Sequence, residues 1–129
     1  MILLLDTTVC VELLRGGPGT RARADVYAAG DLAVSAMTEA ELRYGVVNSA
    51  RPTFMAPVDQ LMRRFHILPF DRAAARAHAE ARHALRRQPI GERDLVIASV
   101  ALAHGLPVAT ANVREFARVP GLAVQDWGR

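Results

Sequence analysis

The chain has 129 residues, of which 51% are hydrophobic and 22% charged, and this composition is typical of a globular domain and excludes a disordered chain. All sixteen basic residues are arginine, and the absence of lysine excludes P-loop and Schiff-base chemistry, both of which need a lysine amine. The net charge of +3 favours a polyanionic partner only weakly, because a genome-wide codon bias would give the same arginine-rich composition.

The cysteine content and the apolar runs bear on the cellular compartment. The single cysteine, Cys10, permits no internal disulfide, and its apolar neighbours favour a buried, inert thiol. The apolar stretch at residues 1–5 is too short for a signal peptide, and no stretch reaches membrane-spanning length. We therefore expect a single domain over residues 1–129, located in the cytoplasm and without a membrane segment.

Short apolar runs alternate with helical patterns along the chain, which is typical of a parallel sheet covered by helices. The run at residues 2–5 predicts a central strand that ends at Asp6, and Thr7 or Thr8 can cap the helix that follows. The next predicted elements, in order, are the rest of that helix to residue 14, a glycine-rich turn at 16–19, a helix over 20–29 closed by Gly30, and a strand over 32–35.

The middle of the chain continues the alternation. A helix opens at Ser35 and runs to Gly45. After Pro52, apolar residues at helical spacing predict another helix with a core or subunit-contact face, formed by Phe54, Val58, Leu61, Met62 and Phe65. Residues 66–69 predict a third strand.

Residues 71–87 predict an alanine-rich helix with two unlike faces. Small side chains on one face allow close approach to a neighbouring element. The opposite face carries a basic line formed by Arg72, Arg76, His83 and Arg87, and such a line is usually a solvated surface.

The stretch from Pro89 to Asn112 places an acid on a buried helical face. Ile97, Ala98 and Ala101 follow Asp94 at i+3, i+4 and i+7, so a helix between Gly91 and Gly105 turns Asp94 toward the core. The helix dipole makes a carboxylate tolerable in the first turn but does not explain its presence. The last predicted elements are a core strand over 106–111, a short helix over 113–118 and a strand over 123–127.

Four polar side chains are expected at one edge of this sheet. Asp6 ends the first strand, Asn112 follows the fourth, and Glu41 and Asp94 lie in the first turns of helices. Ligands of open α/β sheets collect at the carboxyl ends of the strands, and three crowded acids repel one another unless a cation compensates. Oxygen ligands select Mg²⁺ or Mn²⁺, so the inferred chemistry is metal-assisted phosphodiester hydrolysis.

Each of these residues also has a purely structural explanation. Asp6 can cap the first helix, Glu41 stands three residues after Thr38 in a capping-box pattern, and Asn112 can be a turn residue. Asp94 can simply complement a helix dipole. The joint placement of all four, and no single member, favours function.

In four segments the chain resembles PIN-domain ribonucleases, specifically the VapC toxins of bacterial toxin–antitoxin pairs. The segments are LLLDTTVCVELL, SAMTEAELRYG, PIGERDLVIASVAL and LPVATANVREFARVPGLAVQDW, and they occur in family order from Met1 to Trp127. The resemblance implies a PIN fold, Mg²⁺ or Mn²⁺ dependence, endonucleolytic cleavage of RNA, homodimerisation, and neutralisation by a cognate VapB antitoxin in a heterotetramer or larger complex.

The family's site residues carry over by position. By this resemblance Asp6 and Asp94 match the acids that hold the metal, and Glu41 matches the third acid, which helps to bind metal and orient water. Asn112 falls at the fourth position, where some members carry Asp. The predicted catalytic set is therefore Asp6, Glu41, Asp94 and Asn112, with Asp6 and Asp94 as metal ligands.

Two departures from the family pattern affect this set. Thr8 stands where the family commonly has Asn, so a polar contact around Asp6 is expected to differ. Asn112 supplies no charge, which argues against a second metal ion, and Glu115 and Asp126 are the acids that could compensate. Three further residues near the expected site are candidates for contact with RNA or for orienting a ligand: Arg93, Arg114 and Thr110.

Two other functions remain alternatives. Asn112 could mark a weakened catalytic site, which would leave an RNA-binding or partner-binding PIN module. A signalling receiver domain also gathers acids around Mg²⁺ at strand ends, but its chemistry normally needs a lysine, and the chain has none. The endoribonuclease toxin is the preferred hypothesis.

Overall fold

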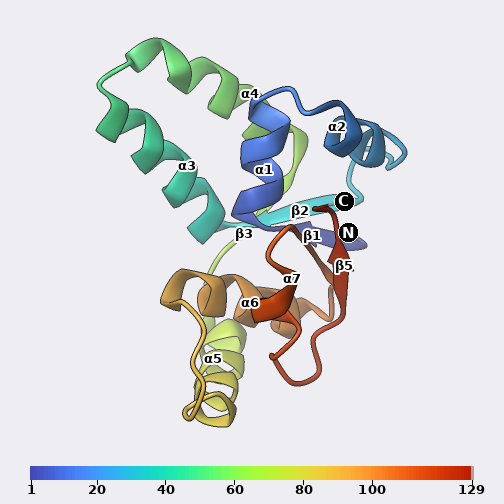
Figure 1. The fold of residues 1–129 in the computed structure, drawn as a ribbon, viewed down its shortest axis with the longest axis vertical. Helices are drawn as coiled ribbons and strands as arrows, with labels where there is room; N and C mark the ends of the chain where they lie inside the picture. The colour runs from blue at the N-terminus through green and yellow to red at the C-terminus, as the bar shows by residue number, and fades with distance from the viewer. Residues whose placement is uncertain (129) are drawn as a thin grey trace.

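Five parallel strands form a sheet in the order β3-β2-β1-β4-β5 in the computed structural model, which describes residues 1–128 (Figure 1). They are β1 (Leu3–Leu5), β2 (Leu32–Ser35), β3 (His66–Leu68), β4 (Val108–Thr110) and β5 (Val124–Asp126). The central strand is β1, whose three leucines are all buried. The predicted α/β class with a mostly parallel sheet of four to five strands is confirmed.

Helices cover both faces of this sheet. On one side lie α1 (Thr7–Leu14), α2 (Pro18–Asp25), α3 (Ala36–Ser49) and α4 (Met55–Arg64), the last preceded by a 3₁₀ turn at Pro52–Phe54. On the other side lie α5 (Arg72–Ala84), α6 (Glu92–His104) and the short α7 (Val113–Phe116) (Figure 1). None of the helices within residues 1–128 is both long and apolar enough to cross a membrane.

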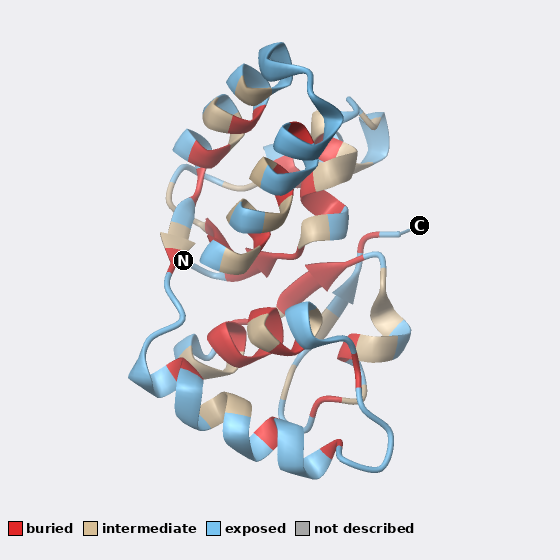
Figure 2. Cartoon of the chain, turned by 90° about the vertical axis from the view of Figure 1, so that its left-hand side faces the viewer, coloured by how far each residue is buried: buried red, intermediate tan, exposed pale blue. Residues whose placement is uncertain are grey.

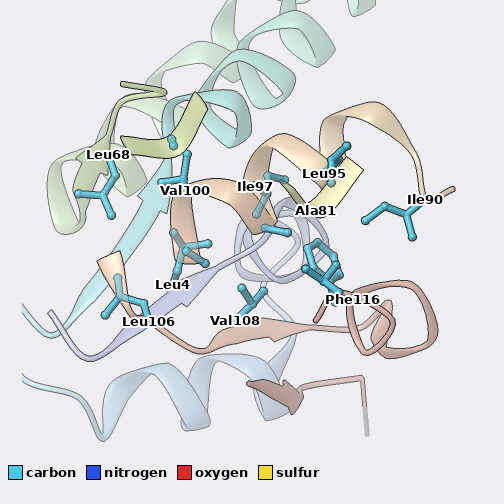
Figure 3. Packing of buried hydrophobic residues seen from close by; sticks show 14 of the residues in the cluster. Leu4, Leu68, Ala81, Ile90, Leu95, Ile97, Val100, Leu106, Val108 and Phe116 are labelled. Atoms are coloured by element: carbon cyan, nitrogen blue, oxygen red, sulfur yellow. The ribbon is translucent and has the colours of Figure 1, made fainter. Parts of the chain in front are cut away.

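The strand side chains alternate between two cores. Leu3 and Leu5 point to the core under α1–α4, whereas Leu4 joins the core under α5–α7. In the second core Leu4 and Val108 pack against Ile97 of α6 (Figure 3). Figure 2 shows the buried residues along the strands and on the helix faces that meet them. Burial on both faces explains why the three inner strands, β1, β2 and β4, are mostly apolar in sequence.

The second predicted helix was wrong at both ends. It begins at Pro18, because proline fits the first position of a helix, where its missing N–H is not needed. It ends at Asp25 and does not reach residue 29, since the carboxylate of Asp31 accepts a hydrogen bond from the Ala28 amide (2.9 Å) and folds the connection into a turn. Gly30 supplies the left-handed backbone of this turn, with φ +90°.

Two other helix ends also differ from prediction. The helix α3 continues through Gly45 to Ser49, and α5 ends at Ala84, three residues before the predicted Arg87. The chain turns after α5, where the amides of Arg86 and Gln88 bond to the carbonyls of His83 and Leu85. Pro89 then favours an extended connection to α6.

Candidate active site

Asp6 lies in the turn between β1 and α1, with only 1% of its surface exposed. Its Oδ1 accepts hydrogen bonds from the Val9 amide (3.0 Å) and the Thr8 hydroxyl (2.6 Å), and its Oδ2 accepts one from the Thr110 hydroxyl (2.5 Å). Burial raises the pKa of Asp6, and these hydrogen bonds oppose that rise. Asp6 is therefore the N-cap of α1, and the prediction of Thr7 or Thr8 as the cap was wrong.

The hydroxyls that hold Asp6 also hold the turn after β4. Thr8 Oγ1 accepts a hydrogen bond from the Ala111 amide (3.0 Å), and Thr110 Oγ1 accepts one from the Asn112 amide (2.8 Å). Each hydroxyl thus donates to the carboxylate and accepts from the backbone. As a result, the turn that carries Asn112 is tied to the start of α1.

Glu41 lies on α3 and is linked to α1 by Thr7, whose hydroxyl donates to Glu41 Oε1 (2.7 Å). The N-cap of α3 is Ser35, whose Oγ accepts a hydrogen bond from the Thr38 amide (3.2 Å). Glu41 is therefore not part of a capping box, and the purely structural explanation of its position was wrong. Adjacent threonines at the start of α1 connect the two acids, because Thr7 donates to Glu41 and Thr8 donates to Asp6.

Asp94 is half-buried in the first turn of α6, and Ile97, Ala98 and Ala101 on the same face are fully buried as predicted. Burial, hydrogen bonding with Glu115, and the negative charges of Glu115, Asp6 and Glu41 together raise the pKa of Asp94 to about 6. Folding thus brings these acids together closely enough to act on one carboxyl group.

Asn112 and Glu115 complete the group around Asp94. The Asn112 side-chain amide donates to Asp94 Oδ2 (3.2 Å). Glu115, three residues on, lies in the first turn of α7 and shares a hydrogen bond with Asp94. The sequence named Glu115 as a candidate for the missing fourth charge without selecting it; the i, i+3 spacing from Asn112 at a helix start was the available signal. Asp126 lies exposed at the end of β5, where its Oδ1 accepts a hydrogen bond from the Gly128 amide (2.9 Å).

The three predicted RNA contacts differ in exposure. Arg93 is exposed and lines a hollow of about 290 Å³ together with Glu41, Met37 and Tyr44. Arg114 is exposed on α7. Thr110 is fully buried (0%), so it cannot touch RNA, and its hydroxyl orients Asp6 instead.

The donor chemistry of this group suits a hard cation. Three other carboxylates raise the pKa of Asp94 and the Asn112 amide donates to it, while no arginine among residues 1–128 forms a salt bridge with any of these groups. Yet within that range no three His, Cys, Asp or Glu side chains are grouped as a ready metal-binding set. Mg²⁺ commonly uses only one or two carboxylates, completed by water and substrate phosphates, so two ligands such as Asp6 and Asp94 suffice.

A larger groove opens beside these acids. It has a volume of about 780 Å³, and Thr7 and Glu41 lie on its wall. Most of its remaining lining is apolar and comes from α1, α3 and α4, including Val11, Leu42 and Val58. The buried thiol of Cys10 on α1 is inert, since burial raises its pKa.

Comparison with known proteins identifies the family of the chain. Residues 3–122 match the PIN domain family. The chain is 35% identical to the tRNA(fMet)-specific endonuclease VapC of Shigella flexneri, covering 96% of each chain, and 31% identical to ribonuclease VapC2 of Rickettsia felis over the full length of both. Its fold superposes on the crystal structure of VapBC2 from Rickettsia felis bound to a promoter DNA fragment with a TM-score of 0.92, at 30% identity, covering 98% of this chain and 99% of that one. The chain therefore belongs to the PIN-domain family and, within it, to the VapC group.

Proposed function

We propose that this protein is a metal-dependent endoribonuclease that hydrolyses RNA phosphodiester bonds and acts as the toxin of a type II toxin–antitoxin pair, inhibiting translation or growth. The observation that supports this most directly is the convergence of Asp6, Glu41 and Glu115 on Asp94, whose pKa rises to about 6. Such uncompensated like charge is costly for a purely structural cluster and is characteristic of a site built for a cation.

Asp6 and Asp94 are the residues that would hold Mg²⁺ or Mn²⁺. When bound, such an ion neutralises charge on the phosphoryl group and acidifies a water molecule. Both oxygens of Asp6 are fixed by hydroxyl and amide donors, which orients this carboxylate before any ligand arrives. Hydroxyl donors fix its geometry without cancelling its charge.

Glu41 and Asn112 orient the reacting groups in this proposal. Thr7 engages Oε1 of Glu41, which leaves Oε2 available to accept a hydrogen bond from the attacking water. Asn112 holds Oδ2 of Asp94 through its amide. Arg93 and Arg114, both exposed, are placed to meet the phosphates that the carboxylates would otherwise repel.

The partners follow from the relatives. The VapC chains superposed on this protein were crystallised as VapBC complexes, one of them bound to promoter DNA. We infer that this chain binds a VapB-type antitoxin, forms homodimers and assembles with the antitoxin into a heterotetramer or larger complex. The apolar groove beside Thr7 and Glu41 is a surface on which an apolar antitoxin segment could shield the acids.

The second candidate, a binding module with a weakened site, depends on the missing charge at Asn112. The hydrogen bond between Glu115 and Asp94 argues against it, because Glu115 supplies a fourth carboxylate at this site. Asn112, whose missing charge suggested the binding module, still has a side-chain carbonyl oxygen and an amide group with which to contact a ligand.

The test is cleavage of single-stranded loop RNA by the purified chain with added Mg²⁺ or Mn²⁺ and with EDTA. We expect metal-dependent cleavage that falls at least about 100-fold in Asp94→Asn and clearly in Glu115→Gln, since even residues behind a metal ligand cost 10–100-fold. The matched control is Asp126→Asn, which removes an exposed carboxylate outside the site and should cleave normally. Equal activity in wild type and Asp94→Asn, or cleavage in EDTA, would contradict the proposal. Sequencing RNA ends after controlled expression would then identify the target.

A further inference from the structure

The positive charge of the protein is concentrated in one segment. Between residues 72 and 93 the chain has six arginines and two acids, Glu80 and Glu92. The rest of the chain has ten arginines and eleven acids, so outside this segment the protein is slightly negative. We call this set of arginines the α5 basic strip: Arg72, Arg76, Arg82, Arg86, Arg87 and Arg93. A uniform codon bias toward arginine would not place the whole surplus in one segment.

None of the strip arginines forms a salt bridge within residues 1–128. All four salt bridges among residues 1–128 lie between Glu12 and Arg64, on the other side of the sheet. The six strip arginines are exposed, and Arg86 alone is tethered, by a hydrogen bond to the His83 carbonyl (2.9 Å). Arg43 on α3, by contrast, forms salt bridges with Glu39 and Asp59. The strip is therefore a surface that favours an anionic ligand.

The strip leads to the candidate active site. Figure 1 shows α5 extending away from the sheet and the following connection returning to the start of α6. Arg93 lies next to Asp94 in that first turn and lines the hollow that also contains Glu41. A helix of 13 residues, the length of α5, spans about 20 Å, which is enough for several nucleotides of single-stranded RNA.

An exposed aromatic ring stands at the start of the strip. Phe70, two residues before α5, is 45% exposed, and its ring meets the edge of His78 at 5.6 Å between centroids. Single-stranded nucleic acids are held by basic surfaces that track the backbone combined with aromatic rings on which bases stack.

We propose that the α5 basic strip and Phe70 bind the RNA strand that flanks the scissile bond, through phosphate contacts and one stacked base. The proposal rests on the proposed ribonuclease function. In this proposal the strip offsets the repulsion between RNA and the four carboxylates. Contacts of this kind are independent of sequence and contribute affinity rather than choice of cleavage site.

The test measures binding of a 20-nucleotide single-stranded RNA to the full chain carrying Asp94→Asn, which prevents cleavage, over a range of salt concentrations. Arg76→Gln/Arg82→Gln should weaken binding about tenfold at low salt and reduce the slope of log affinity against log salt by about 1.4, the value for two lost phosphate contacts. Phe70→Ala should weaken binding about tenfold with an unchanged slope, because stacking releases no counterions.

The matched control is Arg21→Gln/Arg63→Gln, which removes two exposed helical arginines that form no salt bridge among residues 1–128. It should bind RNA like the parent. Arg76→Lys/Arg82→Lys keeps the charge and should retain most of the affinity. The proposal is overturned if the control pair or the lysine pair loses as much RNA affinity as the glutamine pair. It is also overturned if the glutamine pair binds RNA as tightly as the parent, whether or not its antitoxin binding is weaker.

These outcomes are separable from the proposed function. RNA binding that depends on the strip, in a wild-type chain that does not cleave with Mg²⁺ or Mn²⁺, would support the strip and contradict the nuclease. Metal-dependent cleavage together with RNA binding that is unchanged by the strip substitutions would support the nuclease and contradict the strip.

Discussion

Three threonine hydroxyls organise the site at the scale of single residues. Thr8 and Thr110 donate to Asp6, and Thr7 donates to Glu41, at 2.5–2.7 Å. A neutral donor fixes a carboxylate in one orientation and leaves its negative charge available, which an arginine would not do. A cation site has two requirements, which are met by different partners. The protein's hydroxyls fix the geometry of the carboxylates, and the bound cation would balance their charge.

A substitution at Thr8 tests this idea, because the Thr8 hydroxyl links Asp6 to the β4–α7 turn by one hydrogen bond on each side. We expect Thr8→Val to lower the RNA cleavage rate about 10–100-fold, since it removes a donor that orients a proposed metal ligand, while unfolding becomes easier by only about 1 kcal/mol. Thr8→Ser keeps the hydroxyl and should retain activity. Amide exchange at Ala111, which loses its acceptor in the valine variant, should quicken in that variant alone. A valine variant as active as the serine variant would remove the positioning role.

The sequence predicted the acids better than it predicted their partners. Asp6, Glu41 and Asp94 stand at strand ends or early helical turns, and this position follows from the apolar pattern. The roles of Thr7 and Thr8 did not, because a threonine after an aspartate predicts a helix cap as readily as a tertiary hydrogen bond. Glu115 was left undecided for a related reason. Its spacing from Asn112 was a signal, but its contact with Asp94 also depends on how α7 packs against α6, which that spacing does not encode.

At the scale of elements, the start of α6 is held from outside the helix. Gly91 offers no side-chain cap. Arg118, after α7, instead donates from one guanidinium nitrogen to the carbonyls of Gln88 and Pro89 in the segment that precedes α6. Its Nε is buried and has no hydrogen-bond partner among the described residues. Arg118 therefore connects the chain just after α7, the helix of Glu115, to the chain just before α6, the helix of Asp94.

We expect Arg118→Lys to disturb this connection. The lysine side chain is shorter than that of arginine, so its ammonium does not reach the position from which one nitrogen of Arg118 donates to both carbonyls. The free energy of unfolding should fall by about 1–2 kcal/mol, and RNA cleavage should fall with it as the start of α6 loosens. Urea denaturation and cleavage assays measure the two effects. Arg21→Lys on α2 is the control, and a similar loss there, or none in Arg118→Lys, would contradict the role of Arg118.

Helix ends show the limit of prediction at this scale. The strands and the apolar face of α6 followed from apolar runs, whereas α2, α3 and α5 ended three or four residues from their predicted ends. Gly45 predicted an end for α3, but a single glycine inside a helix costs only about 1 kcal/mol, which packing of Leu42 and Val46 in the core outweighs.

At the scale of the whole molecule, the two helical layers bring like charges together. Asp6 and Glu41 come from the layer of α1–α4, and Asp94 and Glu115 come from α6 and α7. These carboxylates are far apart in the unfolded chain and adjacent in the folded one. Their repulsion lowers the free energy of unfolding, so part of the stability of this fold is given up to maintain the site.

This cost predicts a pH-dependent difference between wild type and Asp94→Asn in EDTA. The folded pKa of Asp94 lies near 6, above its ordinary value of 3.8, so between these values the folded state binds more protons than the unfolded state and stability falls as pH rises. Below about pH 4 both states are protonated and the two proteins should be equally stable. Above about pH 6, Asp94→Asn should be more stable by about 1–2 kcal/mol, a figure reduced from the full shift because Asp94 is partly solvated.

Urea denaturation of both proteins at several pH values measures this difference directly, and subtraction removes the titration of the groups that do not interact with Asp94. Adding Mg²⁺ or Mn²⁺ at pH 7 should then stabilise wild type and narrow the gap, because a cation bound only to the folded state both neutralises the cluster and adds binding free energy. Glu80→Gln, which removes an exposed carboxylate of α5 that forms no salt bridge among residues 1–128, should follow wild type at every pH and metal concentration. A stability difference that grows as pH falls, or a metal effect equal in wild type and Asp94→Asn, would show that these carboxylates do not act as one charged site.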